Sequence, residues 1–284
     1  MLFDTGGRFI FYDGAMGTML QKYGLKSGDK PDLMNITAPE AVEEIHKMYI
    51  EAGSDIICTN TFGSNALNLE GTGHDPAEVI TAAVDIAKRA SKDTVKIALN
   101  IGPTGQLLEP YGDLEYEEAY ELFKEMAIAG EMAGADLTAI ETMGALDELK
   151  AAVTAVKENT KLPVFSTMTF DKLGVTYMGC KVEDFVKTAE ALGVAALGLN
   201  CSLEPVEMYE TAERIVNATK LPVIVKPNAG LPDKQDGELH YHTGAKDFAD
   251  QMLKFAAIGV RIVGGCCGTT PEYIKELKKA YLEL

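Results

Sequence analysis

Tryptophan is missing from this chain of 284 residues, and cysteines, basic side chains and long apolar runs are scarce. Five cysteines are too few to hold a chain of this length together as a disulfide framework, so we expect free thiols. The 26 Lys and Arg residues are outnumbered by 43 Asp and Glu residues, giving a formal net charge of −17. Such a surface repels nucleic acid and anionic membranes, so we expect neither as a partner.

The sequence also has no recognisable signal peptide and no membrane helix. Its first residues lack a basic segment followed by an apolar one, and no apolar run approaches the roughly 20 residues that span a bilayer. We therefore expect a cytoplasmic protein. Apolar residues make up 46% of the chain, enough for the core of a single domain over residues 1–284.

Short apolar runs alternate with amphipathic helical patterns along the whole chain. The runs, each typical of a parallel strand covered on both faces, are 9–12, 56–60, 96–101, 137–141, 164–169, 195–200, 223–226 and 261–264. Helical periodicity is clearest in 41–52, 117–133, 205–218, 245–257 and 271–282. Glycines at 53, 134, 193 and 259 recur where helices should end. Eight such units predict an α/β fold, a single (β/α)₈ TIM barrel in preference to an open sheet.

In TIM barrels the chemistry lies at the carboxyl ends of the strands. Here those ends carry polar or metal-binding residues, namely Asp13, Thr59, Asn60, Asn100, Glu141, Thr167, Thr169, Asn200, Cys201, Lys226, Asn228, Cys266 and Cys267. The longest irregular stretches, 26–35, 103–113 and 228–244, are expected to be active-site loops. The sequence thus predicts one functional rim.

The cysteines give the sharpest chemical signal at this rim. Cys266 and Cys267 are adjacent, and their thiols can reach one point only if the backbone turns, which the flanking glycines permit. Cys201 follows the sixth predicted strand, near the eighth around the rim. Three converging thiolates suit Zn²⁺ and leave a fourth position open, as in catalytic zinc sites. The alternative is a structural Cys-Cys pair with an unrelated third thiol.

The two remaining cysteines have plainer interpretations. Cys58 lies inside the second predicted strand and is expected to be a core residue. Cys180 is expected only to pack within its loop, 175–180.

The chain resembles the homocysteine S-methyltransferase family. The motifs that carry the resemblance are DGAMGT at 13–18, TNTF at 59–62, IET at 140–142, GLNC at 198–201, PNAG at 227–230 and GGCCGTTP at 264–271. They follow the family's order over nearly the whole chain. Within the family, they are nearest the homocysteine-binding module of cobalamin-dependent methionine synthase.

The resemblance implies a zinc-dependent (β/α)₈ barrel that binds homocysteine as a thiolate and methylates it to methionine. Carried onto this sequence, the zinc ligands and catalytic centre are Cys201, Cys266 and Cys267. A free thiol has a pKa near ~8.5, and zinc coordination deprotonates it, so the transfer needs no general base from the protein.

The same resemblance assigns the remaining substrate contacts. Asp13 and Glu141 would bind the amino group of homocysteine, and backbone N–H groups near Gly14 its carboxylate. Asn228 would take the fourth zinc position when no substrate is bound. Two alternatives stay open. The carboxylates can instead cap helices or pair with Lys226, and Asn228 can simply turn its loop.

The methyl donor separates the branches of the family. The chain lacks the folate, corrinoid and reactivation modules of the large enzyme, so a separate methylcorrinoid protein is the expected donor and partner. A small donor such as S-methylmethionine, betaine or S-adenosylmethionine would need a pocket beside the zinc, with Phe62, Tyr111 and Tyr177 as aromatic candidates. The 175–180 loop does not match the family.

Two interpretations from another class remain. One is a non-catalytic barrel that senses zinc or thiols, and the other is an assembly component without chemistry. A sensor would have no use for amino-acid-binding carboxylates, so Asp13 and Glu141 argue against it.

Overall fold

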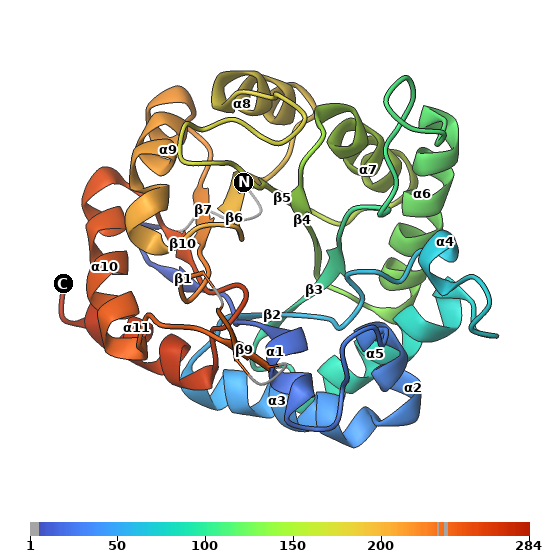
Figure 1. The fold of residues 1–284 in the computed structure, drawn as a ribbon, viewed down its shortest axis with the longest axis horizontal. Coiled ribbons are helices and arrows are strands. Elements are labelled where there is room, and N and C mark those ends of the chain that lie inside the picture. Colours follow the sequence, from blue (N-terminus) through green and yellow to red (C-terminus); the bar gives the residue numbers. More distant parts are fainter. Residues whose placement is uncertain (1–5, 232, 236–237) are drawn as a thin grey trace.

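A computed structural model describes residues 6–231, 233–235 and 238–284 as a closed parallel barrel (Figure 1). Its eight strands are β1 (Ile10–Phe11), β2 (Ile56–Cys58), β3 (Lys96–Ile101), β4 (Leu137–Met143), β5 (Val164–Met168), β6 (Ala196–Asn200), β7 (Val223–Lys226) and β10 (Ile262–Val263). They pair in the order β1-β10-β7-β6-β5-β4-β3-β2. A parallel bridge from Tyr12 to Ile56 joins the first strand to the second and closes the ring. The predicted TIM barrel is confirmed.

An outer ring of helices covers the strands (Figure 1). Its members are α3 (Pro39–Ala52), α5 (Pro76–Ser91), α6 (Tyr116–Ala133), α7 (Leu146–Asn159), α8 (Val182–Ala191), α9 (Pro205–Ala218), α10 (Ala245–Ile258) and α11 (Pro271–Leu282). The glycines expected at helix ends adopt the left-handed conformation, with φ of 107° at Gly53 and 105° at Gly259. None of the helices in the described ranges has the length and apolarity needed to cross a membrane.

The stretches predicted to be irregular contain short elements. A 3₁₀ turn, η1 (Pro31–Leu33), and α2 (Met34–Thr37) follow the first short helix, α1 (Met16–Gln21), and α4 (Ala66–Leu69) follows β2. The predicted loop 228–244 contains an antiparallel hairpin, β8 (Asp233–Gln235) and β9 (Glu238–His240). All of these elements lie in the connections that follow β1, β2 and β7.

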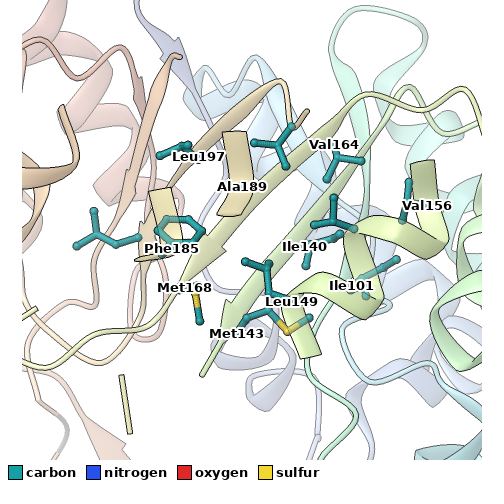
Figure 2. Packing of buried hydrophobic residues seen from close by; sticks show 14 of the residues in the cluster. Ile101, Ile140, Met143, Leu149, Val156, Val164, Met168, Phe185, Ala189 and Leu197 are labelled. Carbon is teal, nitrogen blue, oxygen red and sulfur yellow. The ribbon is translucent and has the colours of Figure 1, made fainter. Parts of the chain in front are cut away.

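Apolar side chains fill both the barrel and the layer outside it. Inside the ring, residues such as Ile56, Phe165 and Ile224 form one cluster. Outside it, Figure 2 shows Met143 and Met168 of the sheet among Leu149 and Phe185 of the covering helices, in a larger cluster. Burying one such side chain contributes about 1.5–3 kcal/mol. A filled interior leaves the carboxyl-end rim as the place for chemistry.

His46 on α3 is an exception within this packing, and its burial predicts a pH effect. The ring is fully buried, neither nitrogen has a hydrogen-bond partner among the described residues, and burial lowers the pKa from 6.5 to about 4. The unfolded chain therefore binds the proton more readily between these values, so stability is lost as pH falls. We expect this histidine to remove about 2 kcal/mol from the free energy of unfolding between pH 7.5 and pH 5.

Urea unfolding of wild type and His46→Leu at the two pH values measures this contribution. On acidification from pH 7.5 to pH 5, the free energy of unfolding of the variant should fall by about 2 kcal/mol less than that of wild type. Equal losses in the two proteins would show that His46 does not titrate on unfolding.

Candidate metal and substrate site

A cavity of about 440 Å³ opens at the carboxyl ends of the strands. Its wall includes six of the predicted site residues, namely Asp13, Gly14, Glu141, Cys201, Cys266 and Cys267. The other side of the cavity comes from the η1 region, where buried Asp32 accepts hydrogen bonds from the Gly63 N–H and the Ser64 hydroxyl. This wall falls within 26–35, one of the stretches that the sequence predicted to be active-site loops, although η1 and α2 are too short to show a helical period.

The three predicted thiols meet at one point of this wall. The sulfurs of Cys201, Cys266 and Cys267 all lie within 4.8 Å of one another, and 3.9 Å separates those of Cys201 and Cys267. Three sulfurs bound to one tetrahedral Zn²⁺ at about 2.3 Å would be about 3.8 Å apart. The interpretation of Cys201 as an unrelated thiol is therefore wrong.

Local backbone geometry brings these thiols together. Cys201 follows β6 in the left-handed region, with φ of 62°, and its N–H donates to the Lys226 carbonyl of β7. A non-glycine residue held there costs about 1–3 kcal/mol, a feature common at functional sites. Cys266 is tied to the same strand connection, because its N–H donates to the Pro227 carbonyl over 2.8 Å.

The flanking glycines act in two different ways. Gly268 has a φ of 80°, so it permits the turn that the sequence predicted. Gly264 and Gly265 are needed for close packing instead. A Cβ on Gly264 would lie 2.6 Å from that of Tyr12, and one on Gly265 would lie 2.2 Å from the Thr269 hydroxyl.

The charges of the thiols depend on one another. Hydrogen bonds from the other two thiols lower the pKa of Cys201 to about 3. The hydrogen bond between Cys266 and Cys201 raises the pKa of Cys266 to about 12. Hydrogen bonds with Cys201 and Cys266 raise the pKa of Cys267. These opposed shifts disfavour three thiolates side by side, and a bound cation would supply the positive charge that allows all three to form.

Asn228 supplies a further polar atom beside this cluster. Its side chain hydrogen-bonds to Cys201, while its buried Oδ1 has no hydrogen-bond partner in the part of the chain that the structure describes. Asn228 is not among the residues that line the cavity. An unpartnered amide oxygen beside three thiols fits a metal that prefers tetrahedral sulfur, nitrogen and oxygen ligands.

A β-bulge aims Glu141 at the cavity. Between Ile140 and Met143 the pairing of β4 with β5 slips, and Thr142 has a φ of 62°. The side chain of Asn200 fixes this bulge, since it accepts from the Thr142 N–H and donates to the Thr142 hydroxyl. These contacts with β6 therefore fix the backbone that places Glu141 in the cavity wall.

Glu141 belongs to a buried charge cluster that also includes Asp13 and Lys226. The Lys226 Nζ lies 2.5 Å from the Glu141 carboxylate, 4.6 Å from the centre of the Tyr12 ring and 4.0 Å from the Cys58 sulfur. Asp13 accepts the Cys58 N–H over 2.7 Å. The ion pair that the sequence left open as an alternative is thus present.

Burial dominates the electrostatics of this charge cluster. It raises the pKa of Asp13 to about 7, and Lys226 only partly opposes the shift. Burial alone would lower the pKa of Lys226, but Cys58 and the two carboxylates raise it well above its usual range. Lys226 therefore stays charged.

The other predicted residues divide between the cavity and the core. Cys58 is buried in the interior cluster as expected, but it also lines the cavity. Cys180 packs in the large core cluster, and burial raises its pKa to about 11. Of the three aromatic candidates, Phe62 lines the cavity, whereas Tyr111 and Tyr177 do not.

Comparisons with known proteins found similar sequences over nearly the whole chain. The family described as homocysteine S-methyltransferase matches residues 10–281. Methionine synthases of Mycobacterium leprae and Mycobacterium tuberculosis are each 34% identical to 96% of the chain. The chain spans only 24% of the length of either relative.

Solved structures share the fold. The metallated form of the homocysteine methyltransferase MmuM from Escherichia coli superposes with a TM-score of 0.82, at 24% identity over 95% of this chain and 96% of that one. Its oxidized form gives the same TM-score at 25% identity, with 95% of each chain covered.

Proposed function

Since the chain belongs to the homocysteine S-methyltransferase family, we propose that it is a zinc-dependent enzyme that methylates homocysteine to methionine. One observation carries the proposal, the convergence of Cys201, Cys266 and Cys267 beside two buried carboxylates in a single cavity. The methyl group would go to sulfur, the atom that such a metal site can hold.

The proposed zinc ligands are the three cysteines, with the Asn228 amide oxygen next to the remaining position. Zinc, when bound, supplies the positive charge that keeps the acceptor sulfur a thiolate at neutral pH. Thiols held this close together are prone to oxidation in air, which supports a reducing, cytoplasmic location.

The amino-acid end of the acceptor would lie against Asp13 and Glu141, which are 3% and 9% exposed. Its carboxylate would approach the backbone at Gly14. A Cβ there would lie 2.6 Å from the Thr269 hydroxyl and 2.9 Å from that of Tyr49, so only glycine fits this wall. These residues bind and orient the acceptor and exchange no proton during the reaction.

In the transfer step, a lone pair of the acceptor sulfur forms the new S–CH₃ bond. The bond between the methyl group and the donor breaks, and its electron pair stays with the donor. Because the acceptor enters the step as a thiolate, no general base is required. The protein's part is to hold the sulfur in line with the methyl group.

We propose a methylcorrinoid carried by a separate protein as the donor. The likeness to methionine synthases over 96% of the chain supports this choice. A small donor is the second candidate, because a cavity of about 440 Å³ with Phe62 in its wall has the size and the aromatic surface for S-methylmethionine, betaine or S-adenosylmethionine.

Methionine formation with each donor tests the proposal. Zinc-loaded enzyme and homocysteine are mixed with a methylcobalamin-loaded carrier protein or free methylcobalamin, and separately with each small donor. We expect methionine in the corrinoid reactions at more than about ten times the rate with any small donor. Methionine from small donors alone would overturn the corrinoid assignment. A barrel that binds zinc and yields no methionine from any donor would be a sensor.

A further inference from the structure

The turn that carries Cys266 and Cys267 ends at Gly268, whose conformation determines its shape. Gly268 has a φ of 80°, a region of backbone space that glycine enters without steric cost. Glycine also has the freest backbone of all residues, and it has no side chain that could hold the turn in place. The turn must therefore be held by contacts from other segments.

Tyr241, in the segment that follows β9, makes one such contact. A Cβ on Gly268 would lie 2.3 Å from two carbons of the Tyr241 ring, so the ring packs directly against the glycine backbone. Burial raises the pKa of Tyr241 to about 12, and Cys267 is the thiol that adds most to the shift. Tyr241 is not among the residues that line the cavity. It therefore contacts the turn from outside the cavity.

Thr18 of α1 contacts the same glycine. Its hydroxyl oxygen accepts the Gly268 N–H over 3.1 Å. The Thr18 side chain also hydrogen-bonds to Tyr241. One hydroxyl can make both bonds, because it accepts with a lone pair and donates its own proton. The Thr18 hydroxyl thus joins the glycine to the tyrosine.

The backbone beside Tyr241 is tied to the same region. The Thr243 N–H donates to the Ala229 carbonyl over 3.1 Å, and the Ala229 N–H donates to the Cys267 carbonyl over 3.0 Å. The Thr243 carbonyl in turn accepts the Tyr273 hydroxyl over 2.7 Å. These bonds fix the segment that presents the Tyr241 ring to the turn.

We propose that Tyr241 and Thr18 are positioning residues that clamp Gly268 and thereby hold Cys267 where it can bind the metal. This inference rests on the proposed function. It goes beyond it by naming two residues, neither of them a metal ligand, that set how long the ion stays bound. Without the clamp, a flexible glycine turn would have to be ordered each time an ion binds, so the ion would be held less tightly.

The test follows the release of zinc from the loaded protein to a coloured chelator, with no substrate present. We expect Tyr241→Leu and Thr18→Val each to release zinc about 10- to 100-fold faster than wild type, the usual effect of losing a residue that supports a metal ligand. Tyr241→Phe keeps the ring and should release zinc no more than about fivefold faster, the value of one hydrogen bond. Release at the wild-type rate from either Tyr241→Leu or Thr18→Val would overturn the inference.

Tyr177→Leu is the matched control. The Tyr177 ring covers another rim glycine, Gly144, where a Cβ would lie 1.7 Å from a ring carbon. Gly144 follows β4 and is not part of the turn that carries the thiols. Loss of the Tyr177 ring should therefore leave the rate of zinc release unchanged. Equal acceleration in Tyr177→Leu and Tyr241→Leu would reveal a general loosening of the rim and would refute the clamp.

Cobalt(II) in place of zinc gives a second readout, because its absorption bands shift when the arrangement of the thiolate ligands changes. The spectrum should change in Tyr241→Leu and match that of wild type in Tyr241→Phe and Tyr177→Leu. An unchanged spectrum in Tyr241→Leu would show that the ring does not position Cys267. If Tyr241→Leu does not fold, Thr18→Val tests the clamp through both readouts.

The same measurements separate this inference from the proposed function. A wild-type protein that binds neither zinc nor cobalt refutes the proposed function, and the clamp with it. Tight binding by wild type and by all the variants alike refutes only the role of Tyr241 and Thr18.

Discussion

Replacing Cys266 with alanine is expected to remove the bound zinc and to reduce methyl transfer by more than about 100-fold, while the barrel stays folded. Changes in residues that only support metal ligands typically cost 10- to 100-fold, and loss of a ligand should cost more. Cys201→Ala and Cys267→Ala should behave alike, because the three sulfurs lie within 4.8 Å of one another. The thiols lie on rim connections outside the apolar clusters, which explains why folding should survive.

Metal analysis after gel filtration, with circular dichroism of the same samples, measures both parts of this expectation. Cys180→Ala is the matched control, since that thiol packs in the core and does not line the cavity. It should keep a full equivalent of zinc and lose only stability. Full zinc retention in all three rim variants would show that Cys201, Cys266 and Cys267 are not the zinc ligands.

The second large effect is expected at Gly198, in the middle of β6. A Cβ at this position would lie 1.9 Å from the carbonyl oxygen of Ile224 on β7. The obstacle is backbone, so the two strands would have to separate. Overpacking in cores costs about 1–3 kcal/mol, and we expect Gly198→Ala to reach about 3 kcal/mol or more. Because β6 leads into Cys201, zinc affinity should fall as well.

Chemical denaturation and zinc titration of Gly198→Ala check this expectation. Gly17→Ala is the control, because a Cβ at Gly17 of α1 would meet nothing within 4 Å. Alanine in that helix should stabilise the protein by up to about 1 kcal/mol. Equal stability of the two variants would show that β6 and β7 can separate at Gly198 at little cost in the free energy of unfolding.

The sequence predicted the barrel well because each strand is buried on both faces and leaves a continuous apolar run. Predicted 164–169 and observed Val164–Met168 differ by one residue. The hairpin at Asp233–Gln235 and Glu238–His240 was missed, since strands of three residues leave no pattern. Long, buried elements are thus the predictable ones.

The site was predictable where chemistry is local and not where it depends on distant contacts. The adjacent pair Cys266 and Cys267 is recognisable in the sequence, and the order of the strands around the barrel places Cys201 beside it. The Glu141–Lys226 pair is different, because it joins β4 to β7 across the interior of the barrel. Nothing in either residue's neighbours in the chain specifies that distance, so the sequence could name Lys226 only as one possible partner of the two carboxylates.

Barrel closure also sets the moment during synthesis at which the site can exist. β1 pairs with β10, so Asp13 meets the Cys266 region only after the last strand has joined the first. This is visible in the contact between the Gly265 N–H and the Asp13 carbonyl, at 3.1 Å. At 5–20 residues per second, a ribosome takes roughly 10 to 50 s to pass from one residue to the other. A nascent chain therefore exposes Asp13 long before it has its partners, and we expect capture of the proposed zinc ion to be among the last events in the protein's maturation.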